Sequence, residues 1–91
     1  MVDGTSAEHP VTARYSESDT ERLIRFEHES RTAVIAQPKR GYAMISVRDS
    51  VNGDELERYY GFDMALDHAA ELLGVSQASL PIPEEAADFG I

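Results

Sequence analysis

The chain lacks cysteine altogether and contains a single lysine, Lys39, among its 91 residues. Without cysteine there can be no disulfide framework, no thiolate zinc site and no cysteine nucleophile. No apolar run approaches the ~20 residues that are needed to span a bilayer, and the polar N-terminus lacks the basic and apolar regions of a signal peptide. We therefore expect one small cytoplasmic domain that does not enter a membrane.

Basic residues are scarce. The chain has 8 Lys and Arg residues and 17 Asp and Glu residues, which gives a formal net charge of −9. Nucleic acids and anionic membranes are bound by cationic surfaces, so this balance argues against nonspecific binding to either. In molar salt the Debye length falls to ~3 Å, and the repulsion among carboxylates largely vanishes. The composition resembles that of small proteins from halophilic archaea, which implies adaptation to concentrated salt. The acidic residues could instead form a binding surface for a basic partner, an interpretation that we rank below salt adaptation.

Four stretches have the alternation or the β-branched content of strands. They are residues 23–28, 32–36, 42–48 and 56–62. Asn52-Gly53 is a strong signal for a two-residue hairpin turn, because both residues tolerate positive φ. Strands with short connections are neighbours in space, so the pattern predicts a four-stranded antiparallel meander.

The apolar period becomes helical after Asp63, which we expect to be an N-cap. The apolar residues at helical spacing are Leu66, Ala69, Ala70 and Leu73. Gly74 follows them, where a glycine often ends a helix. The chain is thus expected to be an α+β protein of order ββββα, with the helix packed on one face of the sheet.

The predicted domain covers residues 21–74. Residues 1–20 are polar and are expected to form a mobile arm, in which residues 11–15 could add a short edge strand. Residues 75–91 are expected to form an irregular tail.

The second face of this sheet mixes apolar, aromatic and arginine side chains, which are enriched at protein interfaces. The candidate interface residues are Leu23, Arg25, Val34, Tyr42, Met44, Arg48 and Tyr59. A core this small supplies only roughly 3–5 kcal/mol, and a two-fold dimer is the commonest way to bury more surface. We therefore predict a homodimer through this face or through a sheet edge, with another protein as a further possible partner. Alternatively, the C-terminal tail folds back over the face.

Motifs for catalysis or cofactor binding are missing: there is no Gly-x-Ser-x-Gly elbow and no phosphate-binding loop. His28 lies between Glu27 and Glu29, but neighbouring side chains of a strand point to opposite faces. His68 and Glu71 are an i, i+3 pair without the second helix that such metal sites use. We therefore expect no catalytic residue, no cofactor and no metal site, and keep a small enzyme or metal-binding protein as an alternative.

The order ββββα over residues 21–74 is similar to that of the PC4-like and Whirly families of single-stranded DNA-binding proteins. This resemblance implies dimers that bind DNA through basic and aromatic residues on strands and loops. Arg25, Arg48, Tyr42 and Tyr59 are then the candidates for stacking and phosphate contacts. Because the net charge opposes nucleic-acid binding, our first interpretation is a non-catalytic interaction domain, and a single-stranded nucleic-acid-binding module is the alternative.

The charge balance predicts a fold that depends on salt. The melting temperature should rise between ~0.1 M and ~2 M NaCl, because salt screens the repulsion among the carboxylates. Thermal unfolding followed by circular dichroism across this range measures the effect. A melting temperature independent of salt would contradict the interpretation.

Overall fold

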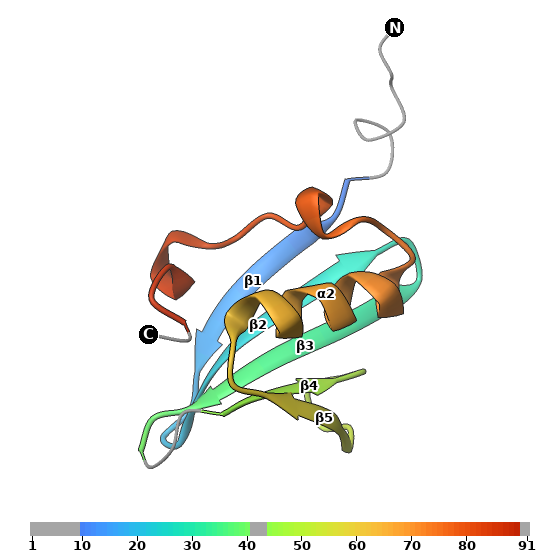
Figure 1. Cartoon of the computed structure of the whole chain (residues 1–91). Coiled ribbons are helices and arrows are strands. Elements are labelled where there is room, and N and C mark those ends of the chain that lie inside the picture. Colours follow the sequence, from blue (N-terminus) through green and yellow to red (C-terminus); the bar gives the residue numbers. More distant parts are fainter. Residues whose placement is uncertain (1–9, 41–43, 90–91) are drawn as a thin grey trace, which may run out of the picture.

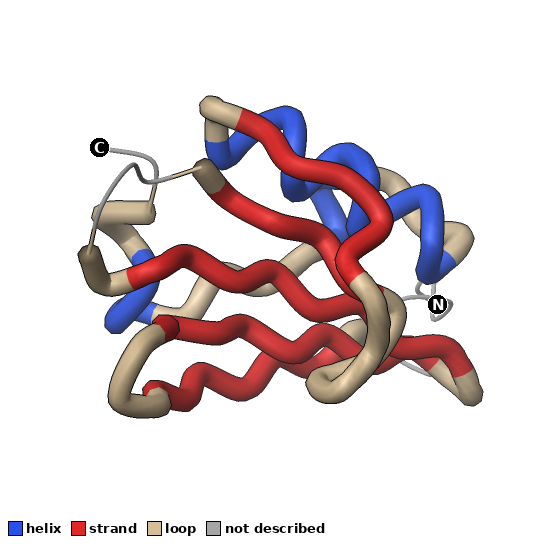
Figure 2. The backbone as a smooth tube through the Cα atoms, turned by 90° about the horizontal axis from the view of Figure 1, so that it is seen from below, coloured by secondary structure: helices blue, strands red, loops and turns tan. Residues whose placement is uncertain are grey.

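Five antiparallel strands and one helix make up the α+β fold of the computed structural model, which describes residues 10–40 and 44–89 (Figure 1). The strands are β1 Thr12–Glu17, β2 Glu21–His28, β3 Arg31–Pro38, β4 Ile45–Arg48 and β5 Glu55–Tyr59. They follow one another across the sheet in chain order (Figure 2). The antiparallel meander is therefore confirmed, whereas the predicted count of four strands was wrong.

The additional strand, β1, lies in the segment expected to form a mobile arm, at the place where residues 11–15 were expected to add a short edge strand. It pairs with β2 from Thr12↔Glu27 to Glu17↔Arg22. Ala13 and Tyr15 are half-buried, and the other four residues of the strand are exposed. Alternation is thus present, but only two apolar side chains carry it, which makes it a weak signal in the sequence.

The helix, α2 Phe62–Leu73, begins after an N-cap at Gly61, so the prediction of Asp63 as the N-cap was wrong. Asp63 lies instead in the first turn, where a carboxylate favours the helix dipole. Gly74 ends the helix with φ 75°, as predicted, and its N–H faces the carbonyls of Ala70 and Glu71. Within the described residues, no helix is long and apolar enough to cross a membrane.

The main core lies between α2 and one face of the sheet. Its buried sheet residues include Ile24, Phe26, Ala33, Ile35, Ile45 and Val47, and α2 contributes Ala65, Leu66, Ala69, Ala70 and Leu73. Leu56 and Tyr60, which the alternation places in this core, are instead 45% and 79% exposed. The register pairs Ile45 with Tyr59, so Tyr59 rather than its neighbours faces the helix.

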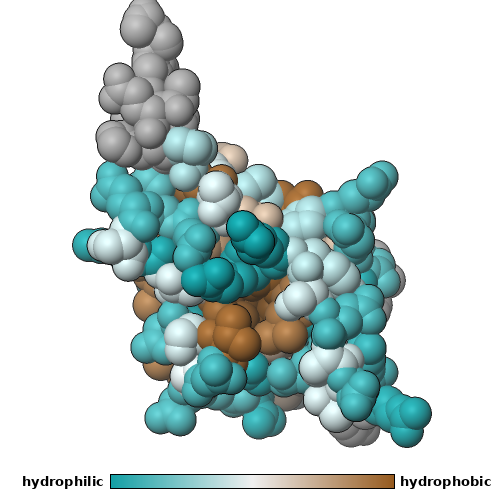
Figure 3. All heavy atoms as spheres, turned by 180° about the vertical axis from the view of Figure 1, so that it is seen from behind, coloured by the Kyte–Doolittle hydropathy of each residue, from teal (hydrophilic) through white to brown (hydrophobic). Residues whose placement is uncertain are grey.

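The C-terminal segment packs against the same side of the sheet as α2. It contains two short 3₁₀ turns, η1 Gln77–Ser79 and η2 Glu84–Ala86. Leu80, Ala86 and Phe89 are buried in the main core with Ile24 and Phe26, and the segment runs beside β1 (Figure 1). It therefore covers the half of the sheet that α2 leaves open. It does not cover the opposite side of the sheet, which is seen in Figure 3.

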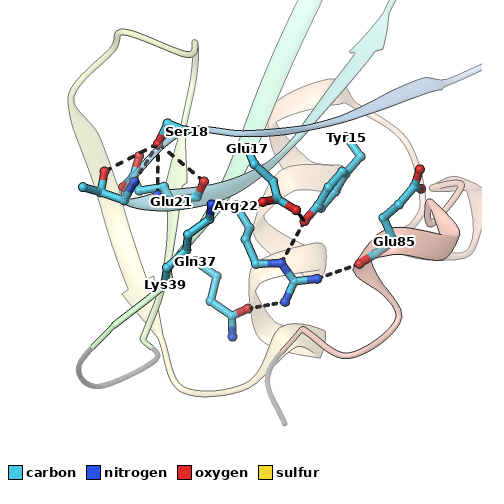
Figure 4. Close-up of polar contacts among 9 residues, drawn as sticks. Tyr15, Glu17, Ser18, Glu21, Arg22, Gln37, Lys39 and Glu85 are labelled. Carbon is cyan, nitrogen blue, oxygen red and sulfur yellow. Dashed lines mark hydrogen bonds and ion pairs between the residues drawn. The ribbon is translucent and has the colours of Figure 1, made fainter.

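Arg22 of β2 holds this segment in place (Figure 4). Its Nη2 donates hydrogen bonds to the Glu85 carbonyl oxygen at 2.6 Å and to Asp88 Oδ1 at 2.8 Å. Its Nε donates to Tyr15 Oη at 2.8 Å, and its guanidinium carbon lies 4.7 Å from the ring centre of Phe89. One side chain thus joins the first two strands to the C-terminal segment.

The Arg22–Asp88 pair predicts release of this segment in acid. The hydrogen bonds from Arg22 hold the pKa of Asp88 below its usual range. The pair therefore stabilises docking above the ordinary carboxyl pKa, and this contribution is lost as the pH falls through the lowered pKa of Asp88. The ring signals of Phe89, which packs against Tyr15 and Phe62, should report undocking in proton NMR.

Asp88→Asn serves as the control for this titration, because it removes the titrating group and keeps the size of the side chain. The variant should lack the acid-dependent shift of the Phe89 signals. The same shift in both proteins would show that another group controls docking.

Candidate interaction surface

The rear face, by which we mean the side of the sheet opposite α2, has a small apolar centre. Leu23, Val34 and Ala36 form a separate buried cluster there, and Ser46 beside them is also buried. Figure 3 shows an apolar spot in the middle of this face, ringed by hydrophilic side chains. The apolar part of the face is therefore largely shielded within one copy of the chain.

Arginines flank this centre because the strand register places them there. Directly opposite residues in an antiparallel pair point to the same side of the sheet. Arg14 faces Arg25, Arg25 faces Val34, and Val34 faces Arg48. Since Val34 is fully buried between two arginines, we infer that their aliphatic stems cover it.

Half of the basic residues of this acidic chain share the rear face. Arg58 lies opposite Ser46 and joins Arg14, Arg25 and Arg48, which makes four of the eight Lys and Arg residues. In contrast, α2 contains no lysine or arginine in its sequence FDMALDHAAELL. The two sides of the protein therefore differ strongly in charge.

Glutamates pair with three of these arginines. Arg48 donates to both carboxylate oxygens of Glu21, at 2.6 and 3.2 Å, and the two side chains are only 17% and 29% exposed. Arg25 Nη2 lies 2.6 Å from Glu27 Oε2 in a more open pair, and Arg58 pairs with Glu55. The rear face therefore carries positive and negative side chains around an apolar centre.

Arg14 is the exception among these arginines. Within the part of the chain that the structure describes, it makes no hydrogen bond or ion pair, and its side chain is exposed. It lies directly opposite Arg25, and like charges in that arrangement repel each other. A carboxylate from outside the chain would relieve this repulsion.

The structure brings together four of the seven residues that the sequence suggested for this surface, namely Leu23, Arg25, Val34 and Arg48. Met44 is half-buried just before β4, and Tyr42 lies outside the described residues. Tyr59 is on the opposite side, where its ring meets that of His68 edge to face at 5.9 Å. Its hydroxyl and His68 Nδ1 are hydrogen-bonded at 3.1 Å.

Sequence reasoning missed Arg14, Leu56 and Arg58 as members of the rear face. Arg14 belongs to a strand that the sequence indicated only weakly. The alternation within residues 56–62 predicts the helix side of the sheet for Leu56, Arg58 and Tyr60, and the pairing of Arg58 with Ser46 shows that this prediction was wrong. The only available signal was the alternation of residues 12–16 and 55–59, which contains few apolar residues.

The second histidine of interest, His28, lines a hollow of about 720 Å³. Its Nδ1 is buried and has no hydrogen-bond partner among the described residues. Ser76 and Ser79, which also line the cavity, are hydrogen-bonded to each other at 3.0 Å, so neither is paired with the imidazole as an activated nucleophile would be. Within the described residues, no group of three or more His, Asp or Glu side chains is arranged to hold a metal ion.

The two glutamate pairs of the rear face should differ in their effect on stability. Glu21→Gln leaves the half-buried guanidinium of Arg48 without its carboxylate and should lower the free energy of unfolding by about 1–2 kcal/mol. Glu27→Gln, the matched control in the pair that is 40% and 42% exposed, should change it by less than about 0.5 kcal/mol. Urea unfolding at one salt concentration measures both, and equal losses would show that Glu21 does not stabilise the centre of the face.

Comparison with known proteins gives a family but no characterised relative. None of the curated proteins and none of the solved structures matches the chain. A family model matches residues 5–91, which include β1, the sheet, α2 and the C-terminal segment. The chain therefore belongs to the family of unknown function DUF7111.

Proposed function

We propose that this chain is a non-catalytic interaction domain that forms a homodimer through its rear face. The observation that carries the proposal is the arrangement of arginines and glutamates around the cluster of Leu23, Val34 and Ala36. In a two-fold interface the same patch meets itself, so a charged patch must carry both signs to be self-complementary. The rear face meets this requirement.

Two features of the rear face suit a second copy of the chain. Arg14 has no carboxylate of its own among the described residues, and a facing copy would bring Glu27 and Glu21 within this surface. Leu56, which is 45% exposed, would add apolar area at the side of β5. Charge pairs would set the orientation of the two copies, while burial of Leu56 and the arginine stems would supply much of the affinity.

Binding of single-stranded nucleic acid is the second candidate, and the row of Arg14, Arg25 and Arg48 is what favours it. Such proteins combine basic residues with aromatic rings on which bases stack. Tyr59 lies on the other side of the sheet, and two of the three arginines are paired with glutamates. We therefore rank this function below self-association.

The test is the molar mass in ~2 M salt, where screening leaves few long-range charge effects. Light scattering should give a dimer of the 10.1 kDa chain, and Arg14→Glu combined with Leu56→Glu should give a monomer with an unchanged circular dichroism spectrum. Glu84→Lys, an exposed change on the C-terminal segment, is the control and should remain dimeric.

A monomeric parent protein, or a dimer that persists in the double variant, would contradict the proposal. Titration of the parent protein with a single-stranded oligonucleotide distinguishes the second candidate. Binding that Arg14→Ala and Arg25→Ala weaken, in a protein that stays monomeric, would favour nucleic acid as the partner.

A further inference from the structure

Strand β5 lies at one edge of the sheet, where charged residues and a register shift protect it but no other described segment pairs with its outer side. It pairs with β4 on one side, and no strand among the described residues pairs with its other side. Four of its five residues are exposed, and it contains neither proline nor glycine. The opposite edge strand differs, because the C-terminal segment packs against β1 through Tyr15 and Phe89. An open edge offers backbone N–H and C=O groups to another chain.

Beside β5 there is a hollow of about 310 Å³ between the end of the strand and the outer side of α2. Tyr59 and His68 line it and are hydrogen-bonded to each other. Met64 also lines it and is 58% exposed, and Tyr60, next to Tyr59 in the chain, is 79% exposed. Large apolar and aromatic side chains therefore remain in water next to the open strand.

Carboxylates surround this hollow. Asp63, Asp67 and Glu71 follow one another at intervals of four residues, which places them along one stripe of α2. Glu57 of β5 joins them on the same side of the sheet, because it lies opposite Val47. None of the four has an ion pair with another described residue. Burial and the nearby carboxylates of Glu57, Glu71 and Asp67 raise the pKa of Tyr59, as a negative potential requires.

We propose that β5 and this hollow bind an extended segment of a basic partner protein, which adds to the sheet as a sixth strand. Backbone hydrogen bonds to β5 would supply affinity, and side chains at alternate positions would supply specificity. Every second side chain of the added strand points to the α2 side, where Lys or Arg would meet the carboxylates and the ring of Tyr59. The intervening side chains point to the rear and would pass Leu56, so small or apolar residues suit them.

The negative charge of the hollow favours a basic partner strand over a second copy of this chain. A second copy pairing β5 with β5 would bring two acidic sites together, because Glu57, Asp67 and Glu71 of each copy have no ion pair among the described residues, whereas Glu55 is paired with Arg58. A basic strand instead matches the potential, and electrostatic complementarity directs such encounters. The hollow lies on the α2 side of the sheet, and Leu56 is the residue that this site and the proposed dimer both use. Strand addition at this site goes beyond that dimer and does not depend on it.

The probe is a synthetic ten-residue peptide that alternates lysine and valine, added to the full-length, ¹⁵N-labelled protein. The titration uses the lowest salt concentration at which the circular dichroism spectrum is native. Amide signals of Glu55–Tyr59 should shift and become protected from hydrogen exchange, and signals of Asp67 and Glu71 should shift with them. A peptide with glutamate in place of lysine should not bind, and a peptide with N-methylated backbone should bind at least about tenfold more weakly.

Asp67→Asn combined with Glu71→Gln should raise the dissociation constant of the lysine peptide about tenfold or more, because two carboxylates near the bound cations are neutralised. Glu84→Gln combined with Glu85→Gln removes the same charge from exposed positions on the C-terminal segment and should change it less than about twofold. These matched pairs separate the hollow from the overall net charge.

Three results would overturn the proposal. The first is no binding, or binding with signal changes confined to the rear face. The second is an equal loss of affinity in the two double variants, which would indicate nonspecific attraction to an acidic protein. The third is protection of the β5 amides that rises with protein concentration in the absence of peptide, which would make a second copy the occupant of this edge.

Discussion

The guanidinium of Arg22 in β2 connects strand β1 to the irregular C-terminal segment. It reaches Tyr15 of β1, Glu85 and Asp88 of the C-terminal segment, and the ring of Phe89. The helix is too narrow to cover five strands, so the half of the sheet near β1 needs another cover. The irregular segment has no hydrogen-bonded ladder of its own, so it depends on a few buried side chains and on this arginine. Because Arg22 is always charged, the docking of the segment is controlled by the protonation of its acidic partner.

The two sides of the sheet carry different charges, and this difference underlies both proposed binding surfaces. The helix has no lysine or arginine, whereas the rear face has four arginines, one on each of β1, β2, β4 and β5. The rear pattern follows from register, because a one-residue slip of β2 would move Arg25 to the core and Ile24 to water. Burial of Ile24 and Phe26 therefore fixes where the arginines stand. The core and the candidate interaction surface are two consequences of one alignment of strands.

The sequence predicted several elements whose signals are local and strong. Ile24 and Phe26 mark β2, and Gly74 marks the end of α2, because large apolar residues at period two and a glycine in the left-handed region have few alternatives. The two-residue turn expected at Asn52-Gly53 was wrong, because neither residue has positive φ and a longer loop joins Arg48 of β4 to Glu55 of β5. The face of β5 could not be predicted, since Leu56, Tyr59 and Tyr60 fit either parity and only pairing with β4 decides between them. The row of Arg14, Arg25 and Arg48 could not be predicted for the same reason. Its residues are up to 34 positions apart in the sequence, and only the strand register aligns them.

The two proposed surfaces have a joint consequence. A dimer through the rear face leaves the α2 side of each copy in water, so the two hollows beside β5 would both be open. A partner with two basic extended segments could then occupy both, and the second binding event would be intramolecular. The gain depends on whether the linker between the segments spans the two edges, since a linker that is too short gives no gain at all. Affinity for a single lysine peptide and affinity for a tandem peptide with a long flexible linker should therefore diverge in the dimer and agree in the monomeric variant.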